Sequence, residues 1–303
     1  MNKNSNAATH NAMPSPEPSH AISLPDGRTL ALDEYGDPEG RPVLLLPSAP
    51  GSRRLDPDPA VTSAAGIRLL VVDRPGYGAS TPLPDGTAAS WAALADDLAE
   101  ALRALGVTRT TVVGWSNGGI GALALAATHP SLVESVAVVG TPAPDDDLPW
   151  LPDEHRGMLH SLRPDPESAI AALTATLAVL VDEPALAMGS LSRCPANERL
   201  LAQPAVRAAL ETMLAEAFRP GAAGLATDIA ATNVSPPGFD LETIEVPVQL
   251  WYGAGDIIIP STHGEYYASK IPGACLETVA DIGHLVLIDR WAEILEGVLA
   301  PRS

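Results

Sequence analysis

The chain of 303 residues is poor in the residues that bind nucleic acids or insert into membranes. It carries 18 lysines and arginines against 37 aspartates and glutamates, a formal charge of −19, and aromatic residues make up only 4%. A surface of this charge repels phosphate backbones and anionic lipid headgroups, so we expect neither nucleic acid nor membrane as a partner. No apolar run approaches the roughly 18 residues that a spanning helix needs, so we expect no transmembrane segment.

Cysteine is also scarce, since only Cys194 and Cys275 occur. They lie far apart and lack metal-ligand spacing, which argues against a disulfide framework and predicts two buried thiols in a reducing compartment. Residues 1–20 are polar and lack the apolar core of a signal peptide, so we interpret them as a disordered tail. These features together predict a cytoplasmic protein, and the sequence carries no signal for its oligomeric state.

Apolar residues are abundant, at 46% of the chain, and many of them form short runs between glycines and prolines. The continuous apolar run at 43–46 is typical of a strand that is covered on both faces, as in parallel sheets. Further strands are predicted at 67–73, 107–114 and 133–139. Residues 90–105 between two of these strands repeat apolar side chains with the period of an amphipathic helix. The alternation predicts an α/β fold with a doubly wound, mostly parallel sheet.

One serine stands at the junction of a predicted strand and a predicted helix. Gly114, Trp115, Ser116, Asn117 and Gly118 follow a β-branched run and precede an alanine-rich helical stretch at 117–128. A serine on such a sharp turn projects its hydroxyl out of the sheet, and the two glycines relieve crowding around the turn. The helix N-terminus then directs its backbone N–H groups toward a developing negative charge. We therefore predict that Ser116 is a nucleophile.

Further motifs accompany this turn, and together they resemble the α/β-hydrolase superfamily. They are Leu-Leu-Leu-Pro-Ser-Ala-Pro-Gly at 44–51, Asp-Arg-Pro-Gly-Tyr-Gly at 73–78, Gly-Ala-Gly-Asp at 253–256 and Gly-His at 283–284. The matching stretches run from about residue 22 to 140 and from 246 to 299. The pattern is similar to the lid-bearing serine hydrolases that include carboxylesterases, lactonases and proline iminopeptidases.

The resemblance implies a catalytic triad of Ser116, Asp256 and His284, in the chain order of that superfamily. Both partners follow predicted strands, as the edge of an open α/β sheet requires. His263 is the competing base, and the run that begins at Asp145 is the competing acid, although we interpret that run as a solvated turn.

The resemblance also implies an oxyanion hole made by the backbone N–H groups of Ala49 and Asn117. This sequence departs from the family pattern in that loop, because Pro47 replaces a histidine and Ser48 replaces a glycine. These departures put the geometry of the oxyanion hole in question, and Ser48 could add a hydroxyl donor there.

The strand and helix alternation stops between residues 141 and 245. This part is punctuated by prolines and predicts helices at 168–181, 205–218 and 222–232, which we interpret as an inserted lid. The hydrolase core then comprises residues 21–140 and 246–303. Aliphatic and methionine side chains of the lid are the expected pocket wall: Met158, Leu162, Leu177, Met188 and Met213.

A cluster of potential ligands in the lid invites a metal-site interpretation. It consists of Asp153, Glu154, His155 and His160. The two histidines are five residues apart and do not share a helix face, so we predict no metal site and no cofactor.

The predicted function is hydrolysis of an ester, lactone or related acyl bond in a small, mainly apolar molecule. A serine at the turn argues against haloalkane dehalogenases and epoxide hydrolases, which use a carboxylate there. Two alternatives stay open. One is a ligand-binding or sensing protein with negligible turnover, supported by Pro47 and Ser48, and the other is a cofactor-free lyase or oxygenase, or a carbon–carbon hydrolase, that uses the same triad.

Overall fold

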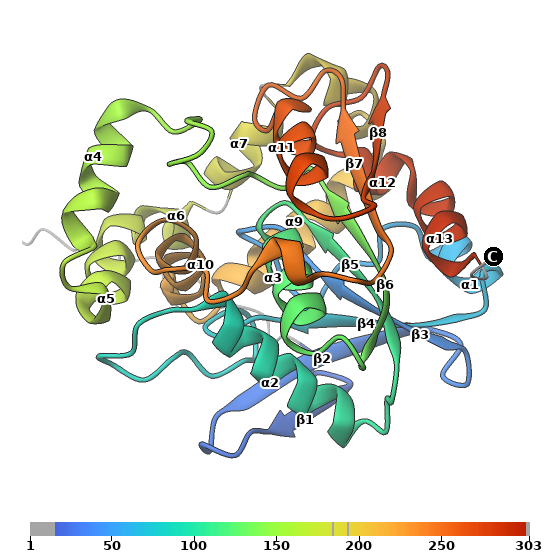
Figure 1. Cartoon of the computed structure of the whole chain (residues 1–303), viewed down its shortest axis with the longest axis horizontal. Coiled ribbons are helices and arrows are strands. Elements are labelled where there is room, and N and C mark those ends of the chain that lie inside the picture. The colour runs from blue at the N-terminus through green and yellow to red at the C-terminus, as the bar shows by residue number, and fades with distance from the viewer. Residues whose placement is uncertain (1–15, 184, 193, 301–303) are drawn as a thin grey trace, which may run out of the picture.

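The computed structural model describes residues 16–183, 185–192 and 194–300, and its centre is one eight-stranded sheet (Figure 1). The strand order is β1-β2-β4-β3-β5-β6-β7-β8. Strand β2 runs antiparallel to both of its neighbours, and all other pairs are parallel. The doubly wound, mostly parallel sheet is therefore confirmed. The strands are β1 (His20–Ser23), β2 (Thr29–Gly36), β3 (Arg41–Leu46), β4 (Ile67–Asp73), β5 (Thr110–Trp115), β6 (Val133–Val139), β7 (Val248–Gly253) and β8 (Cys275–Val279).

Helices cover both faces of the sheet, which explains the continuous apolar runs of its central strands. Successive residues of β3 point to opposite faces, so Leu44 and Leu46 belong to one core and Val43 and Leu45 to the other. The first core is closed by α2 (Trp91–Ala104), α3 (Asn117–Thr128) and α11 (Thr262–Lys270). The second is closed by α12 (Val286–Asp289) and α13 (Trp291–Leu299), with α1 (Pro59–Ala64) beside them (Figure 1).

A long helical segment connects β6 to β7. Figure 1 shows α4, α5, α6 and α10 gathered on one side of the sheet, away from α1 and α13. The helix predicted at 168–181 is two helices, α5 and α6, because the chain departs from helical hydrogen bonding around Ala178. The segment contains α4 (Asp153–Leu162), α5 (Pro166–Leu177), α6 (Val179–Asp182), α7 (Ala185–Ser192), η1 (Pro195–Asn197), α8 (Glu198–Leu201), α9 (Pro204–Phe218), α10 (Ala223–Asn233) and η2 (Leu241–Thr243).

Two expectations about the surface are wrong. His20, which was expected to belong to a disordered tail, begins β1, and its Nε2 lies 2.7 Å from a carboxylate oxygen of Glu34. Residues 1–15 of the predicted tail lie outside the described part of the chain. Cys194 is buried as expected, but Cys275 is exposed because it begins the edge strand β8. Among the described residues no helix is long and apolar enough to span a membrane.

Candidate active site

Ser116 occupies a strained turn between β5 and α3. Its φ of 55° and ψ of −130° lie in a region that residues with a Cβ rarely adopt. The backbone around it is pinned, since Ser116 N–H donates to the Val139 carbonyl at 2.8 Å and the Thr141 hydroxyl donates to the Ser116 carbonyl at 2.8 Å. Such an over-determined turn is typical of a side chain that must be held at the edge of a sheet.

Glycine is required around this turn because other backbone segments approach closely. A Cβ on Gly118 would come far inside van der Waals contact with the carbonyl oxygen of Leu46, and one on Gly114 would meet the backbone of Gly119. The sequence pattern identified both positions. It missed Gly119, where a Cβ would meet the hydroxyl of Thr141.

The variant Gly118→Ala tests this close approach. We expect it to lower the free energy of unfolding by roughly 1–3 kcal/mol and to reduce catalysis, because the obstacle is backbone and cannot move aside. The matched control is Gly157→Ala in α4, where a Cβ meets nothing within 4 Å. That change should stabilise the protein by about 0.5–1 kcal/mol. Urea denaturation of both variants is the measurement, and equal effects would contradict the steric argument.

Asp256 and His284 form a buried hydrogen-bonded pair. His284 Nδ1 lies 2.7 Å from Asp256 Oδ2, and the two side chains are only 5% and 0% exposed. The other carboxylate oxygen, Oδ1, accepts from the N–H groups of Ile258 and Ile259 at 2.8 and 3.0 Å. These bonds fix the carboxylate, which in turn orients the ring so that Nε2 is left for a different partner.

Two residues that the sequence analysis did not single out position the histidine. Trp115 Nε1 donates to the His284 carbonyl at 3.0 Å, and the two rings lie 5.9 Å apart. Gly140 has a φ of 56°, and a Cβ there would lie 3.3 Å from His284 Nδ1. The only signal for Gly140 in the sequence is its place directly after a strand.

Asp145, the competing acid, makes its hydrogen bonds to other groups than a histidine. Asp145 accepts from the N–H groups of Trp150 and Leu151, both at 2.7 Å, and pairs with Arg156. It is buried, so the interpretation of this run as a solvated turn is wrong at Asp145. Burial alone would raise the pKa of Asp145, but the Arg156 guanidinium and the two N–H donors hold it below its usual value.

The competing base, His263, also has hydrogen-bond and packing partners other than Ser116. Its Nδ1 accepts from the Ala143 N–H at 3.0 Å, and its ring packs edge-on against Trp150. Burial lowers the pKa of His263, against the weaker opposite effects of Asp256 and Asp145. A histidine that accepts a backbone hydrogen bond must be neutral at that nitrogen, so His263 is a structural group here.

This lowered pKa gives a pH-dependent stability. The unfolded chain binds the proton at an ordinary pKa of about 6.5, whereas the folded chain binds it only at lower pH. Stability from His263 is therefore fully present above pH 6.5 and is lost as the pH falls toward the folded pKa. We expect the denaturant concentration at the unfolding midpoint to decrease as the pH is lowered from 7.5 to 5. The decrease should be smaller in His263→Gln. Parallel pH profiles for the two proteins would contradict this assignment.

The residues that carry the candidate oxyanion donors line the same cavity as the serine. Ala49 lies in the loop after β3 and Asn117 begins α3, and both line the cavity with Ser116 and His284. Within the described residues, neither backbone N–H has a hydrogen-bond acceptor. The Ser48 hydroxyl is not an additional donor, because it donates to the Pro50 carbonyl at 2.8 Å.

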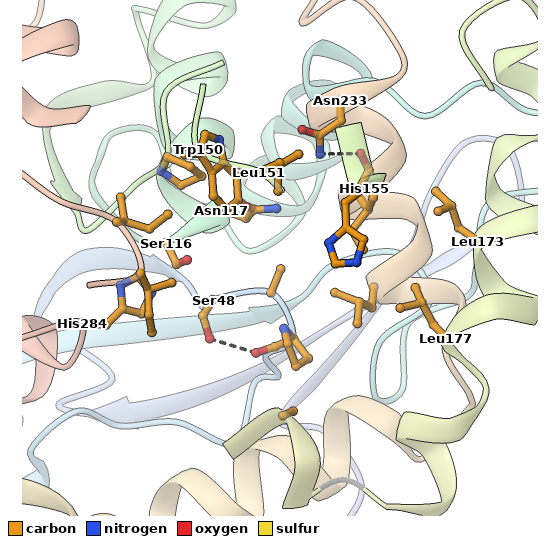
Figure 2. Close-up of a pocket in the computed structure, with 18 of the residues that line it drawn as sticks. Ser48, Ser116, Asn117, Trp150, Leu151, His155, Leu173, Leu177, Asn233 and His284 are labelled. Carbon is orange, nitrogen blue, oxygen red and sulfur yellow. Dashed lines mark hydrogen bonds between the residues drawn. The ribbon is translucent and has the colours of Figure 1, made fainter. Parts of the chain in front are cut away.

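The cavity has a volume of about 450 Å³ and mostly apolar walls. Figure 2 shows Ser116 and His284 on one side of it, with Leu173 and Leu177 of α5 on the other. Of the expected wall residues, Met158, Leu177 and Met213 line the cavity, whereas Leu162 and Met188 do not. His155 and Asn233 are polar lining residues that the sequence analysis did not predict (Figure 2).

The four potential metal ligands of the lid are separated in the structure. Asp153 pairs with Arg156, His160 lies 3.2 Å from Asp146, and His155 faces the cavity. Among the described residues no group of three histidine, cysteine or acidic side chains could hold a metal ion.

The structure thus brings His284 and Asp256 into hydrogen-bond contact and places Ser116 on the same cavity. Among the described residues, the Ser116 hydroxyl makes no hydrogen bond to His284. A proton transfer between them therefore requires this hydrogen bond to form when substrate binds, as is common for catalytic hydrogen bonds that are long or poorly aligned in the free enzyme.

Comparison with known proteins points to one family. The sequence profile described as alpha/beta hydrolase fold matches residues 41–290. A pimeloyl-acyl-carrier-protein methyl ester esterase from Aromatoleum aromaticum is 29% identical over 231 residues, covering 73% of this chain and 81% of that protein. A proline iminopeptidase from Xylella fastidiosa is 33% identical over 119 residues, only 39% of this chain and 38% of its own. The esterase EaEST from Exiguobacterium antarcticum superposes with a TM-score of 0.71 at 22% identity, over 92% of this chain and 97% of its own.

Proposed function

The chain belongs to the α/β-hydrolase fold family and is a hydrolase of that fold, and from this premise we propose that it is a serine hydrolase. Its substrate is an ester, lactone or related acyl compound of a small, mainly apolar molecule. The observation that supports the proposal is that a strained serine, the histidine of a buried histidine–aspartate pair and the residues Ala49 and Asn117 line one apolar cavity.

Each group has one role in the proposed reaction. Ser116 Oγ attacks the carbonyl carbon while His284 Nε2 takes the hydroxyl proton. The carbonyl oxygen becomes an oxyanion, which accepts hydrogen bonds from the N–H groups of Ala49 and Asn117. The tetrahedral intermediate then collapses, and His284 returns the proton to the leaving oxygen. Water hydrolyses the acyl-enzyme by the same sequence of steps, while Asp256 stabilises the charged imidazole.

The size and the apolar walls of the cavity favour a substrate with a small, apolar acyl or alcohol group. A volume of about 450 Å³ lies at the lower end of the range for small-molecule sites. Leu159, Leu173, Leu225 and Ile229 from the inserted helices contribute aliphatic surface. We infer that residues 141–245 act as a lid over a core of residues 21–140 and 246–303. The name of the Aromatoleum relative, an esterase of a methyl ester, supports ester cleavage as the reaction class.

The proposal is tested by intact-protein mass spectrometry after exposure to a fluorophosphonate, together with burst kinetics on short- and medium-chain p-nitrophenyl esters. We expect one adduct that disappears in Ser116→Ala, and a burst equal to the enzyme concentration. Absence of adduct and turnover in folded protein would favour a binding or sensing protein. Turnover of other substrates without an acyl-enzyme would favour a lyase, oxygenase or carbon–carbon hydrolase.

A further inference from the structure

A buried ion pair lies directly beneath the loop that carries Ala49. Arg74, from the turn after β4, binds Asp228 of α10 through Nε at 3.1 Å and Nη2 at 2.6 Å. The Tyr77 hydroxyl donates to the same carboxylate at 2.9 Å. Arg74 is 1% exposed and Asp228 is 3% exposed, so this pair joins the hydrolase core to the inserted helices within the protein interior.

The remaining donors of Arg74 hold the loop itself. Nη1 donates to the Pro47 carbonyl at 2.6 Å, and Nη2 donates to the Ser48 carbonyl at 2.7 Å. The Ser48 carbonyl and the Ala49 N–H belong to one planar trans peptide group, in which they point in opposite directions. Fixing the carbonyl on the guanidinium therefore aims the Ala49 N–H away from Arg74.

The same helix also contacts the residue that carries the second donor. Thr232 follows Asp228 by one turn of α10, and its hydroxyl donates to the Asp228 carbonyl at 2.8 Å. That hydroxyl lies 3.3 Å from both Asn117 Nδ2 and Trp91 Nε1 and accepts from each. One face of α10 thus contacts the Asn117 side chain directly, and it is linked to the peptide group of Ala49 through Arg74.

We propose that Arg74, Asp228 and Thr232 are positioning residues that set the two halves of the oxyanion hole relative to each other. This inference rests on the proposed function. Arginine suits the task because its planar fork binds a carboxylate and two carbonyls in fixed directions, and burial keeps water from competing for these bonds.

The test compares two threonines of α10 that share one kind of hydrogen bond and differ in another. Thr232 and Thr227 both donate to the carbonyl four residues earlier, but only Thr232 also accepts from Asn117. Thr232→Val should lower kcat while KM stays near the wild-type value, and Thr227→Val is the matched control. Asp228→Asn should have a larger effect, about 10–100-fold in kcat, since small displacements of a reacting group cost this much.

A second readout separates positioning from general loss of structure. A trifluoromethyl ketone adds to the serine and places its oxyanion in the hole, so its affinity should fall by the same factor as kcat in each variant. Thermal melts confirm that the variants are folded at the assay temperature. If Thr232→Val and Asp228→Asn are folded and match Thr227→Val in both kcat and ketone affinity, the positioning inference is overturned and the proposed function still stands. A folded wild type without turnover or labelling would overturn the proposed function and the inference with it.

Discussion

Replacing Ser116 with alanine is expected to lower kcat on an ester by about a millionfold, because the group that forms the covalent bond is gone. His284→Ala should cause a loss of similar size, since the serine hydroxyl is a weak nucleophile without a base. The double variant should lose little beyond either single one. This non-additivity is expected when two residues act as one unit, and it is a stronger test than either loss alone.

The measurement is kcat for the wild type, the two single variants and the double variant on one p-nitrophenyl ester. The two variants that lack Ser116 are first treated with fluorophosphonate, so that traces of wild-type enzyme do not set their apparent rate. Ser161→Ala is the control, because this exposed hydroxyl donates only to the Met158 carbonyl within α4. Losses in the two single variants that multiply in the double variant would contradict a shared catalytic role.

The second large effect is expected for Asp256→Asn, at about 10⁴-fold in kcat. The asparagine oxygen can still accept from the N–H groups of Ile258 and Ile259, so the turn should keep its shape. Its NH₂ group then faces His284 Nδ1 and requires that nitrogen to be an acceptor. The neutral ring must carry its proton on Nε2, where it cannot take a proton from Ser116.

The matched control is Asp145→Asn, since Asp145 also accepts two backbone N–H groups with one oxygen. Its other oxygen meets Arg156 instead of a histidine. We expect this variant to lose about 1 kcal/mol of stability with the charged pair and to keep kcat within the same order of magnitude. If Asp145→Asn, still folded, lost as much kcat as Asp256→Asn, the identity of the acid would be open again.

The central strands of the sheet were predictable because they are short, mainly apolar runs that end at glycine, proline or polar residues. The run at 133–139 is the whole of β6, and the helix predicted at 117–128 is α3. The positions of Ser116, Asp256 and His284 were predictable for the same reason, since each follows a strand and parallel strands end at one edge. Their roles stay predictions until the variants above are measured.

The inserted segment was less predictable, because its short helices are fixed by contacts with the core more than by their own sequences. The break between α5 and α6 lies at Ala178, and an alanine there gives no sequence signal for the end of a helix, as a proline or glycine would. Asp145 pairs with Arg156 of α4, 11 residues away, and the pairing of Arg74 with Asp228 spans 154 residues. Exposure of Cys275 follows from its strand being at the sheet edge, which requires the strand order.

The attachment of α10 to the core also limits how such an enzyme can diversify. Most of the cavity wall comes from the segment between β6 and β7, so exchanging that segment between relatives is an obvious route to new substrates. The portion that includes Asp228 and Thr232 does not transfer freely, because its partners Arg74 and Asn117 belong to the core, which is not exchanged with the segment. Chimeras joined after α8 should therefore retain catalysis more often than chimeras that replace the entire segment, and substrate range can evolve in α4 to α8 while α10 is inherited with the core.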